Sequence, residues 1–246
     1  MTALVLLPGM DGTGALFVEF LSFLGEEIKP IVVSYPRDLP LGYEELEEFA
    51  RSFLPANEPY VLLGESFSGP IAISLAAARP AGLVGVVLSC SYARNPVPWF
   101  GPLKGAVGLI PISSKLVGLV APVMFGRFSS SVLRESLKRA IDSVTSAAIR
   151  ARMRAALTVD YSEKLKEIQV PILYLQASSD LVVPAYASRQ IVKYGQSVQL
   201  VKLRGAHLLL QVLPFESATV VEKFIKRVVA DRRSISDSQQ EKLPSP

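Results

Sequence analysis

Three residues of this sequence have side chains that could together perform nucleophilic catalysis: Ser66, Asp180 and His207. A serine hydroxyl is a weak nucleophile and needs a neighbouring base, and histidine is the best side-chain base near neutral pH. The chain has one histidine, so a serine that is activated by histidine here must use His207. A carboxylate that accepts a bond from the other ring nitrogen would fix the tautomer, and Asp180 is the candidate.

Ser66 stands in a pattern typical of a strained turn. The segment Gly64-Glu65-Ser66-Phe67-Ser68-Gly69 lies between the apolar run 60–63 and the alanine-rich run 70–78, which predict a buried strand and a helix. Small residues two positions before and two after the serine leave room for neighbouring backbone, as in a nucleophile elbow. Because short Gly/Ser patterns occur by chance, the alternative is an ordinary turn that happens to contain a serine.

The predicted strands would bring the three residues together. Apolar runs predict strands at 3–7, 30–35, 60–63, 83–88, 170–175 and 198–203, and helices at 15–24, 43–53, 70–78, 184–194 and 215–229 alternate with them. This alternation favours a parallel sheet, in which sites form at the carboxyl ends of the strands. Ser66, Asp180 and His207 each follow a strand.

The candidate base and acid each have a simpler interpretation. His207 could be a loop histidine with a local role, and Asp180 could be a turn or helix cap before Pro184. Their positions after the last two strands favour the catalytic interpretation. Asp160 is a weaker rival for the acid, and we expect it on the surface.

A serine hydrolase also needs two donors for the oxyanion of its tetrahedral intermediate. The backbone N–H of Phe67, which follows the serine, is one candidate, and the Met10 N–H in the glycine-rich loop 8–14 is the other. The alternative for this loop is a dinucleotide fingerprint. Its glycines do not have the Gly-x-Gly-x-x-Gly spacing and no acidic residue ends the second predicted strand. We therefore expect no cofactor.

The alternation of strands and helices stops between residues 91 and 160. This segment has several prolines and a helical apolar stripe but no clear buried strand, which predicts a helical lid inserted over the sheet rather than two crossover helices. We expect Trp99, Met124 and Phe125 to contact substrate, although such residues can simply pack a lid onto a core. Residues 1–90 and 161–231 would form the core, and residues 232–246 a disordered tail.

Composition excludes several other classes of protein. The chain has 246 residues, half of them apolar, and a net charge of +4 with no nucleic-acid recognition motif. Its one cysteine, Cys90, cannot form an internal disulfide and has no metal-ligand cluster in the sequence around it. We expect a buried cysteine rather than a nucleophile, and no metal. No leader or membrane span is visible, so we expect a cytoplasmic protein.

The chain resembles the α/β-hydrolase superfamily, in its serine esterase, lipase and thioesterase group, over about residues 3–230. The nucleophile, acid and histidine occur in that order. The segment Val170-Pro171-Ile172-Leu173 before Asp180 resembles the family's acid strand, and Gly205-Ala206-His207 resembles its histidine loop. The resemblance implies a three-layer αβα fold in which the family's first two strands are missing, leaving about six parallel strands.

The chain also departs from the family pattern. Pro8-Gly9 replaces the common His-Gly before the oxyanion residue, and Ser68 replaces the commoner glycine. Both substitutions keep the required backbone role or small size. The loop 7–14 resembles that of a subset including the hydrolase part of plant phytyl ester synthases, which sets no substrate.

These features predict hydrolysis of small-molecule carboxylic esters with an apolar acyl or alkyl part, through an acyl-enzyme. One alternative is a thioesterase, or an esterase for acyl groups on an acidic carrier protein. It is motivated by basic residues of the insertion, although a solvated helix face explains these residues better. These residues are Arg134, Lys138, Arg139, Arg150 and Arg154; Arg152 adds to the same charge. A ligand-binding protein with an idle triad is the non-enzyme alternative.

Overall fold

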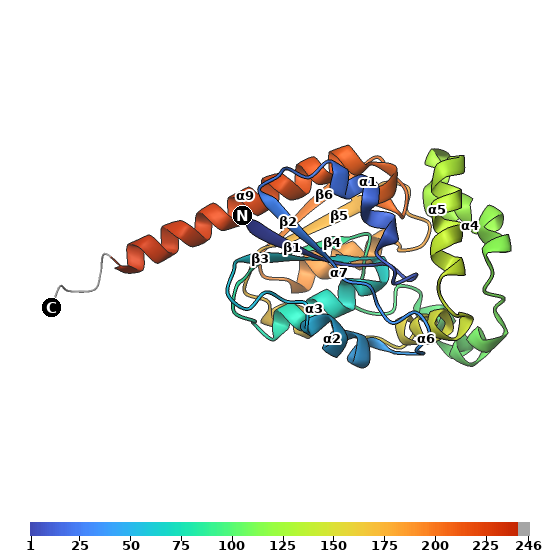
Figure 1. Cartoon of the computed structure of the whole chain (residues 1–246). Coiled ribbons are helices and arrows are strands. Elements are labelled where there is room, and N and C mark those ends of the chain that lie inside the picture. Colours follow the sequence, from blue (N-terminus) through green and yellow to red (C-terminus); the bar gives the residue numbers. More distant parts are fainter. Residues whose placement is uncertain (241–246) are drawn as a thin grey trace.

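The computed structural model describes residues 1–240 and contains one sheet of six parallel strands in the order β2-β1-β3-β4-β5-β6. The strands are β1 (Thr2–Leu7), β2 (Ile28–Val32), β3 (Tyr60–Glu65), β4 (Leu83–Ser89), β5 (Ile172–Ala177) and β6 (Val198–Leu203). The predicted αβα architecture is confirmed. In Figure 1 the carboxyl ends of the strands point towards the helices of the insertion.

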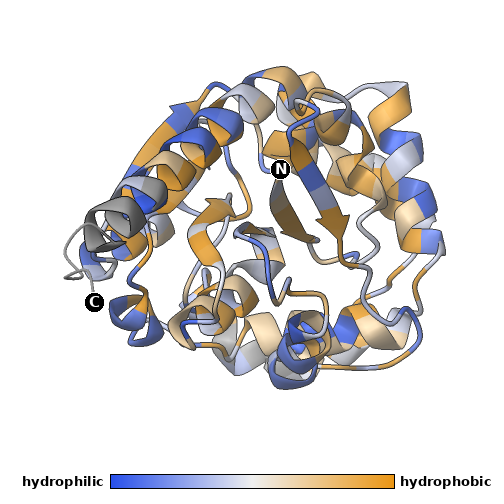
Figure 2. Ribbon diagram, turned by 60° about the vertical axis from the view of Figure 1, so that its left-hand side comes forward, coloured by the Kyte–Doolittle hydropathy of each residue, from blue (hydrophilic) through white to orange (hydrophobic). Residues whose placement is uncertain are grey.

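Helices cover both faces of the sheet (Figure 1). One face packs on α1 (Val18–Ser22) and α9 (Pro214–Gln240), and the other on α2 (Tyr43–Arg51), α3 (Gly69–Ala77) and α7 (Ala185–Tyr194); α8 is the short helix Leu209–Val212. Alternate residues of β1 enter opposite cores: Val5 joins the cluster of α2 and α3, and Leu6 joins that of α1 and α9. Burial on both faces explains the continuous apolar strands, which appear orange in Figure 2.

The second strand is shifted from its predicted position. It spans Ile28–Val32 rather than 30–35 and pairs only with β1, with Leu4 opposite Pro30. Proline is tolerated in an edge strand because one side of such a strand forms no ladder. The prediction placed Pro30 at the start of the strand, whereas the structure places it in the middle.

The C-terminal helix is longer than predicted. It runs from Pro214 to Gln240, so residues 232–240 are helical here rather than disordered. No proline or glycine interrupts residues 215–243, and the polar residues after 231 include several that tolerate a helix. Residues 241–246 of the predicted tail lie outside the described residues.

The insertion, residues 91–160, leaves and rejoins the core at one place. The Asn95 N–H donates to the Val159 carbonyl at 2.9 Å, and the Tyr161 N–H donates to the Ala93 carbonyl at 2.8 Å. Between these contacts lie a 3₁₀ helix (Pro98–Leu109), two short 3₁₀ turns and three α-helices: α4 (Val117–Phe125), α5 (Ser131–Asp142) and α6 (Ser146–Ala156). These helices stand beyond the carboxyl ends of the strands (Figure 1).

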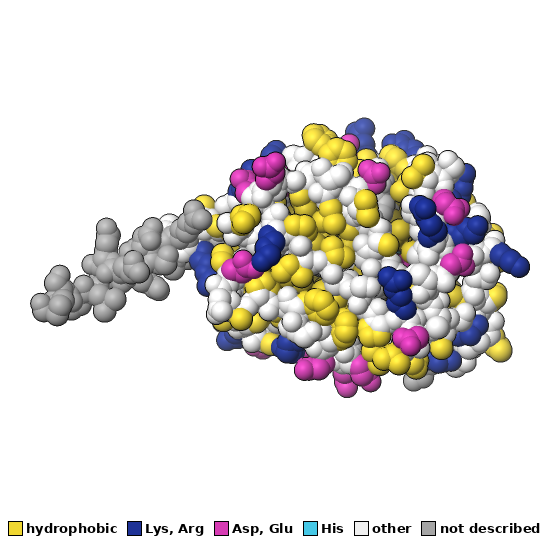
Figure 3. Space-filling model, viewed as in Figure 1, with side chains coloured by type: hydrophobic (Ala, Val, Ile, Leu, Met, Phe, Trp, Pro, Cys, Tyr) yellow, Lys and Arg dark blue, Asp and Glu magenta, His cyan; other side chains and the backbone are white. Residues whose placement is uncertain are grey.

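The surface shows no single block of charge in the view of Figure 3, where Lys and Arg side chains alternate with Asp and Glu. No histidine colour appears on this face, in agreement with a sole histidine that is 2% exposed. In residues 1–240, no helix combines the length and the apolar composition that crossing a membrane requires.

Candidate active site

Ser66 occupies a strained turn between β3 and α3. Its φ is 48°, in the left-handed region that a residue with a Cβ seldom adopts. The flanking glycines make this turn possible. A Cβ at Gly64 would lie 2.8 Å from the Ser68 carbonyl oxygen, and one at Gly69 would lie 1.7 Å from Ser91 Oγ. The local geometry is therefore that of a nucleophile elbow.

Ser66, His207 and Asp180 form a continuous hydrogen-bonded chain. Ser66 Oγ lies 2.8 Å from His207 Nε2, and His207 Nδ1 lies 3.0 Å from each carboxylate oxygen of Asp180. The N–H groups of Val182 and Val183 each donate to Asp180 Oδ1 at 2.9 Å, which fixes the carboxylate. The three side chains follow β3, β6 and β5, so the carboxyl edge of the sheet brings them together as expected. This arrangement can move a proton from the hydroxyl to the imidazole.

The rival acid, Asp160, lies elsewhere. It is exposed at the base of the insertion, where its Oδ1 accepts the Ser162 N–H at 3.0 Å and its backbone pairs with Arg94. The structure therefore leaves Asp180 as the carboxylate beside His207.

The loop after β1 approaches the serine. A Cβ at Gly9 would lie 4.0 Å from Ser66 Cβ. The Gly12 N–H donates to the Gly9 carbonyl at 3.0 Å, which directs the Met10 N–H of the same peptide unit the opposite way. Among residues 1–240 no backbone or side-chain acceptor takes the Met10 N–H. The Phe67 N–H is at the start of a helical segment, where N–H groups are unpaired and the helix dipole is positive.

Ser68 has a role that the sequence did not predict. Its hydroxyl donates to the Pro8 carbonyl, and Tyr35 Oη lies 2.8 Å from Ser68 Oγ. Since the one hydroxyl proton of Ser68 goes to Pro8, Tyr35 must donate to Ser68. These bonds tie the elbow to the loop after β1. The only signal in the sequence was a hydroxyl where the family more often has glycine.

Cys90 lies beside the acid and the base. Ligand atoms of Cys90, Asp180 and His207 lie within 4.8 Å of one another, a cluster that sequence spacing did not show. Burial, and then the Asp180 carboxylate, raises the pKa of the Cys90 thiol. A protonated thiol is a poor nucleophile, and Asp180 and His207 already bond to each other. The raised pKa of the thiol therefore does not support a cysteine nucleophile.

Glu65, which immediately precedes Ser66 in the chain, has a buried carboxyl group. It is 1% exposed, and burial raises its pKa to about 8, with the charge of the Asp11 carboxylate reinforcing the shift. Neither Glu65 Oε1 nor the amide of Gln211 has a hydrogen-bond partner among the described residues. With its pKa raised to about 8, Glu65 holds its proton at neutral pH.

Because its pKa is raised on folding, Glu65 should make the free energy of unfolding of the protein fall as the pH rises. The folded protein holds this proton up to about pH 8, whereas the unfolded chain releases it near its ordinary pKa of 4.5. The stabilisation is therefore complete below about pH 4.5 and is lost towards pH 8 and above. We expect Glu65→Gln to be more stable than wild type by about 3–5 kcal/mol at pH 8, and by much less at pH 5.

Urea denaturation at both pH values measures this difference. Glu48→Gln is the matched control, because the Glu48 side chain is 81% exposed. If the free energy of unfolding changes with pH in the same way for wild type and Glu65→Gln, the raised pKa of Glu65 is wrong.

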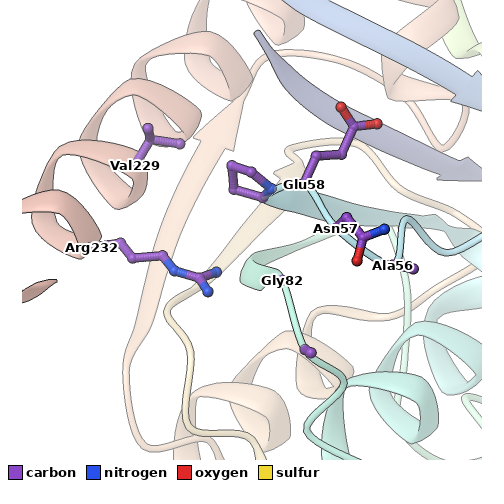
Figure 4. A pocket seen from close by; sticks show the side chains of 8 residues that line it. Ala56, Asn57, Glu58, Gly82, Val229 and Arg232 are labelled. Atoms are coloured by element: carbon purple, nitrogen blue, oxygen red, sulfur yellow. The ribbon is translucent and has the colours of Figure 1, made fainter.

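Two surface hollows lie away from Ser66 Oγ. The one in Figure 4 has a volume of about 370 Å³ and is lined by residues that precede β3 and β4 and by α9, at the opposite edge of the sheet from Ser66. The other, about 540 Å³, lies beside the acid loop and is lined by Arg127, Ser178, Ser179, Lys202, Leu203 and Arg204. Neither contains the residues predicted to contact substrate.

The insertion packs against both sides of the site. Phe125 and, in part, Met124 belong to an apolar cluster with Leu208, the neighbour of His207. Met10 packs against a second cluster formed by α6 and the segment before it. Trp99 is 62% exposed, with its ring 6.5 Å from that of Tyr186. The substrate contacts of Trp99, Met124 and Phe125 stay a prediction.

Comparison with known proteins defines the family. Residues 4–222 match the model of the alpha/beta hydrolase family, and the chain belongs to that family. Comparison with curated protein sequences finds no match.

Solved structures agree in fold. An esterase from Thermogutta terrifontis has a TM-score of 0.79 at 16% identity, covering 93% of this chain and 90% of that one. A hydrolase from Oleispira antarctica has a TM-score of 0.77 at 15% identity, covering 92% and 91%. An enol-lactonase from Burkholderia xenovorans has a TM-score of 0.76 at 16% identity, covering 93% and 91%. Likeness at this identity establishes the fold and leaves the substrate open.

Proposed function

We propose that this protein is a serine hydrolase that cleaves carboxylic esters with an apolar acyl or alkyl part. The observation that carries the proposal is the chain of hydrogen bonds from Ser66 Oγ through His207 to Asp180, at 2.8 and 3.0 Å. Three polar side chains from distant segments meet in a buried place, and each is hydrogen-bonded to the next. That arrangement costs desolvation and is most simply explained by a chemical role.

The reaction has two half-reactions. Ser66 Oγ attacks the ester carbonyl carbon while His207 Nε2 takes the hydroxyl proton, and the carbonyl oxygen becomes an oxyanion held by the Met10 and Phe67 N–H groups. His207 then gives the proton to the departing alcohol, leaving an acyl-enzyme on Ser66. Water, deprotonated by His207, releases the acid and restores the serine. Asp180 holds the ring and stabilises the imidazolium at each step.

A serine nucleophile favours acyl transfer over the dehalogenase chemistry that the family performs with aspartate. The apolar contacts of Met10 and Leu208 with the insertion support an apolar substrate part. Within this proposal the insertion acts as a lid over Ser66.

The thioesterase alternative is favoured by one observation. The hollow beside the acid loop is lined by three cations, Arg127, Lys202 and Arg204, and by no acidic residue. Such a lining suits a phosphate-bearing leaving group of a carrier or coenzyme. The basic residues of the insertion contribute less than expected, because Arg150 donates to the Ile110 carbonyl and Arg152 is buried.

A panel of substrates tests the proposal. We expect turnover of p-nitrophenyl esters, with a preference among chain lengths from acetate to laurate, and lower kcat/KM for coenzyme A thioesters of the same acyl groups. A higher kcat/KM for the thioesters would select the alternative. No turnover of any ester or thioester would favour the non-enzyme reading, a ligand-binding protein.

A further inference from the structure

Arg152 of α6 is not part of the solvated basic face that the sequence suggested. It is 1% exposed, and its guanidinium reaches out of the insertion into the core. Nη1 donates to the carbonyls of Met10 and Asp11, at 3.2 and 2.7 Å, and Nη2 donates to the Pro36 carbonyl at 2.8 Å. One side chain of the insertion thus binds both the loop after β1 and the loop after β2.

The loop after β1 is shaped around this guanidinium. Gly12 has a φ of 72°, and a Cβ there would lie 2.3 Å from Arg152 Nη1. The Tyr35 ring lies 5.7 Å from the guanidinium carbon, and the Asp11 carboxylate supports the charge while burial lowers the pKa of Arg152. A buried cation is costly unless its donors are satisfied. Here three carbonyls accept from Nη1 and Nη2, whereas Nε has no hydrogen-bond partner among the described residues. The Asp11 carboxylate makes no direct bond to the cation.

The contacts fix the backbone on both sides of the Met10 Cα. The preceding peptide unit is held because the Gly9 carbonyl accepts the Gly12 N–H. The following unit is held because the Met10 carbonyl accepts from Arg152. Each peptide unit is planar, so holding its carbonyl also fixes its N–H. With the carbonyls of Gly9 and Met10 both held, the Met10 N–H can point in only one direction. That direction faces away from the Gly9 carbonyl, on a loop that packs against Ser66.

We propose that Arg152 is a positioning residue that aligns the Met10 N–H for the oxyanion by holding the carbonyls of Met10, Asp11 and Pro36. The inference rests on the proposed function. It also assigns the insertion a second task. Besides covering the site, the insertion supplies the side chain that holds the loop after β1 in its active shape.

Steady-state kinetics on two variants test the proposal. Arg152→Met removes the donors and keeps an apolar stem, and we expect kcat for p-nitrophenyl butyrate to fall about 100-fold while KM changes less than about threefold. Arg152→Lys keeps the charge, but an ammonium cannot span the carbonyls as a guanidinium does. We expect a loss in kcat of about tenfold. Arg154→Met, an exposed residue on the same helix, is the matched control with unchanged kcat.

A second readout separates alignment from general damage. An alkyl boronic acid forms a tetrahedral adduct on a serine and places an oxygen where the oxyanion would be. Its affinity should fall by the same factor as kcat, whereas a purely structural role would lower the melting temperature and leave kcat per folded molecule unchanged. If Arg152→Met does not fold, Arg152→Lys decides alone.

The outcomes are distinct. A kcat and a boronic acid affinity within threefold of wild type in folded Arg152→Met, or in Arg152→Lys when it alone folds, would overturn the positioning role and leave the hydrolase standing. A wild-type protein that turns over no ester and binds no boronic acid would overturn the proposed function and the positioning role with it.

Discussion

Replacing His207 with alanine should lower kcat/KM for ester hydrolysis by about a thousandfold or more. His207 is the one imidazole of the chain, and its Nε2 lies 2.8 Å from Ser66 Oγ. No other histidine can replace it, so the hydroxyl would lose its base and the leaving alcohol its acid. Hydrolysis of p-nitrophenyl butyrate measures the effect.

A companion variant guards against misfolding. His207→Gln fills most of the same space beside Asp180 but accepts no proton, so it should be as inactive as His207→Ala. Circular dichroism checks that both variants fold. Imidazole added to His207→Ala should recover part of the rate, because the deletion leaves room for it. A folded variant with more than a tenth of wild-type activity would contradict the role of His207 as base.

Replacing Asp180 with asparagine should have the second largest effect, a loss in kcat of about 10²- to 10⁴-fold. An amide can donate its own proton to His207 Nδ1, which favours the tautomer that carries a proton on Nε2 and cannot accept one from Ser66. The two backbone bonds from Val182 and Val183 to the side-chain oxygen should survive the change, so the loop should keep its shape.

The rival carboxylate supplies the control for this experiment. Asp160→Asn should retain wild-type kcat, because Asp160 is exposed at the base of the insertion, where its side chain accepts the Ser162 N–H. Equal losses in the two variants, or a loss confined to Asp160→Asn, would show that the acid has been assigned to the wrong residue.

The strands and the meeting of the three polar side chains could be predicted from the sequence, because both follow from patterns of neighbouring residues. Apolar runs such as Leu4 to Leu7 are buried on both faces and therefore leave a continuous signal. Residues that follow parallel strands meet at one edge whatever the details of packing. The order of Ser66, Asp180 and His207 was therefore sufficient to predict that they meet.

The supporting residues could not be predicted in this way. Arg152 stands among other basic residues on an insertion helix, and nothing in its spacing separates it from Arg150 or Arg154. Its burial depends on how α6 packs on a loop about 140 positions earlier in the chain. The same holds for Ser68, whose partners Pro8 and Tyr35 come from distant loops, and for the buried Glu65 carboxyl. A local pattern predicts which helix, strand or loop a residue belongs to. The roles of these supporting residues depend instead on tertiary contacts.

The central claim is that Ser66 is the nucleophile, and covalent labelling tests it most directly. A fluorophosphonate probe should modify the wild-type protein at one site. Tandem mass spectrometry of the tryptic peptide 52–94, which keeps the Arg79-Pro80 bond because trypsin does not cleave before proline, should place the adduct on Ser66. Ser52→Ala, in the same peptide, should label as well as wild type. Ser66→Ala should not label. An unlabelled wild-type protein, or an adduct that persists in Ser66→Ala, would contradict the account.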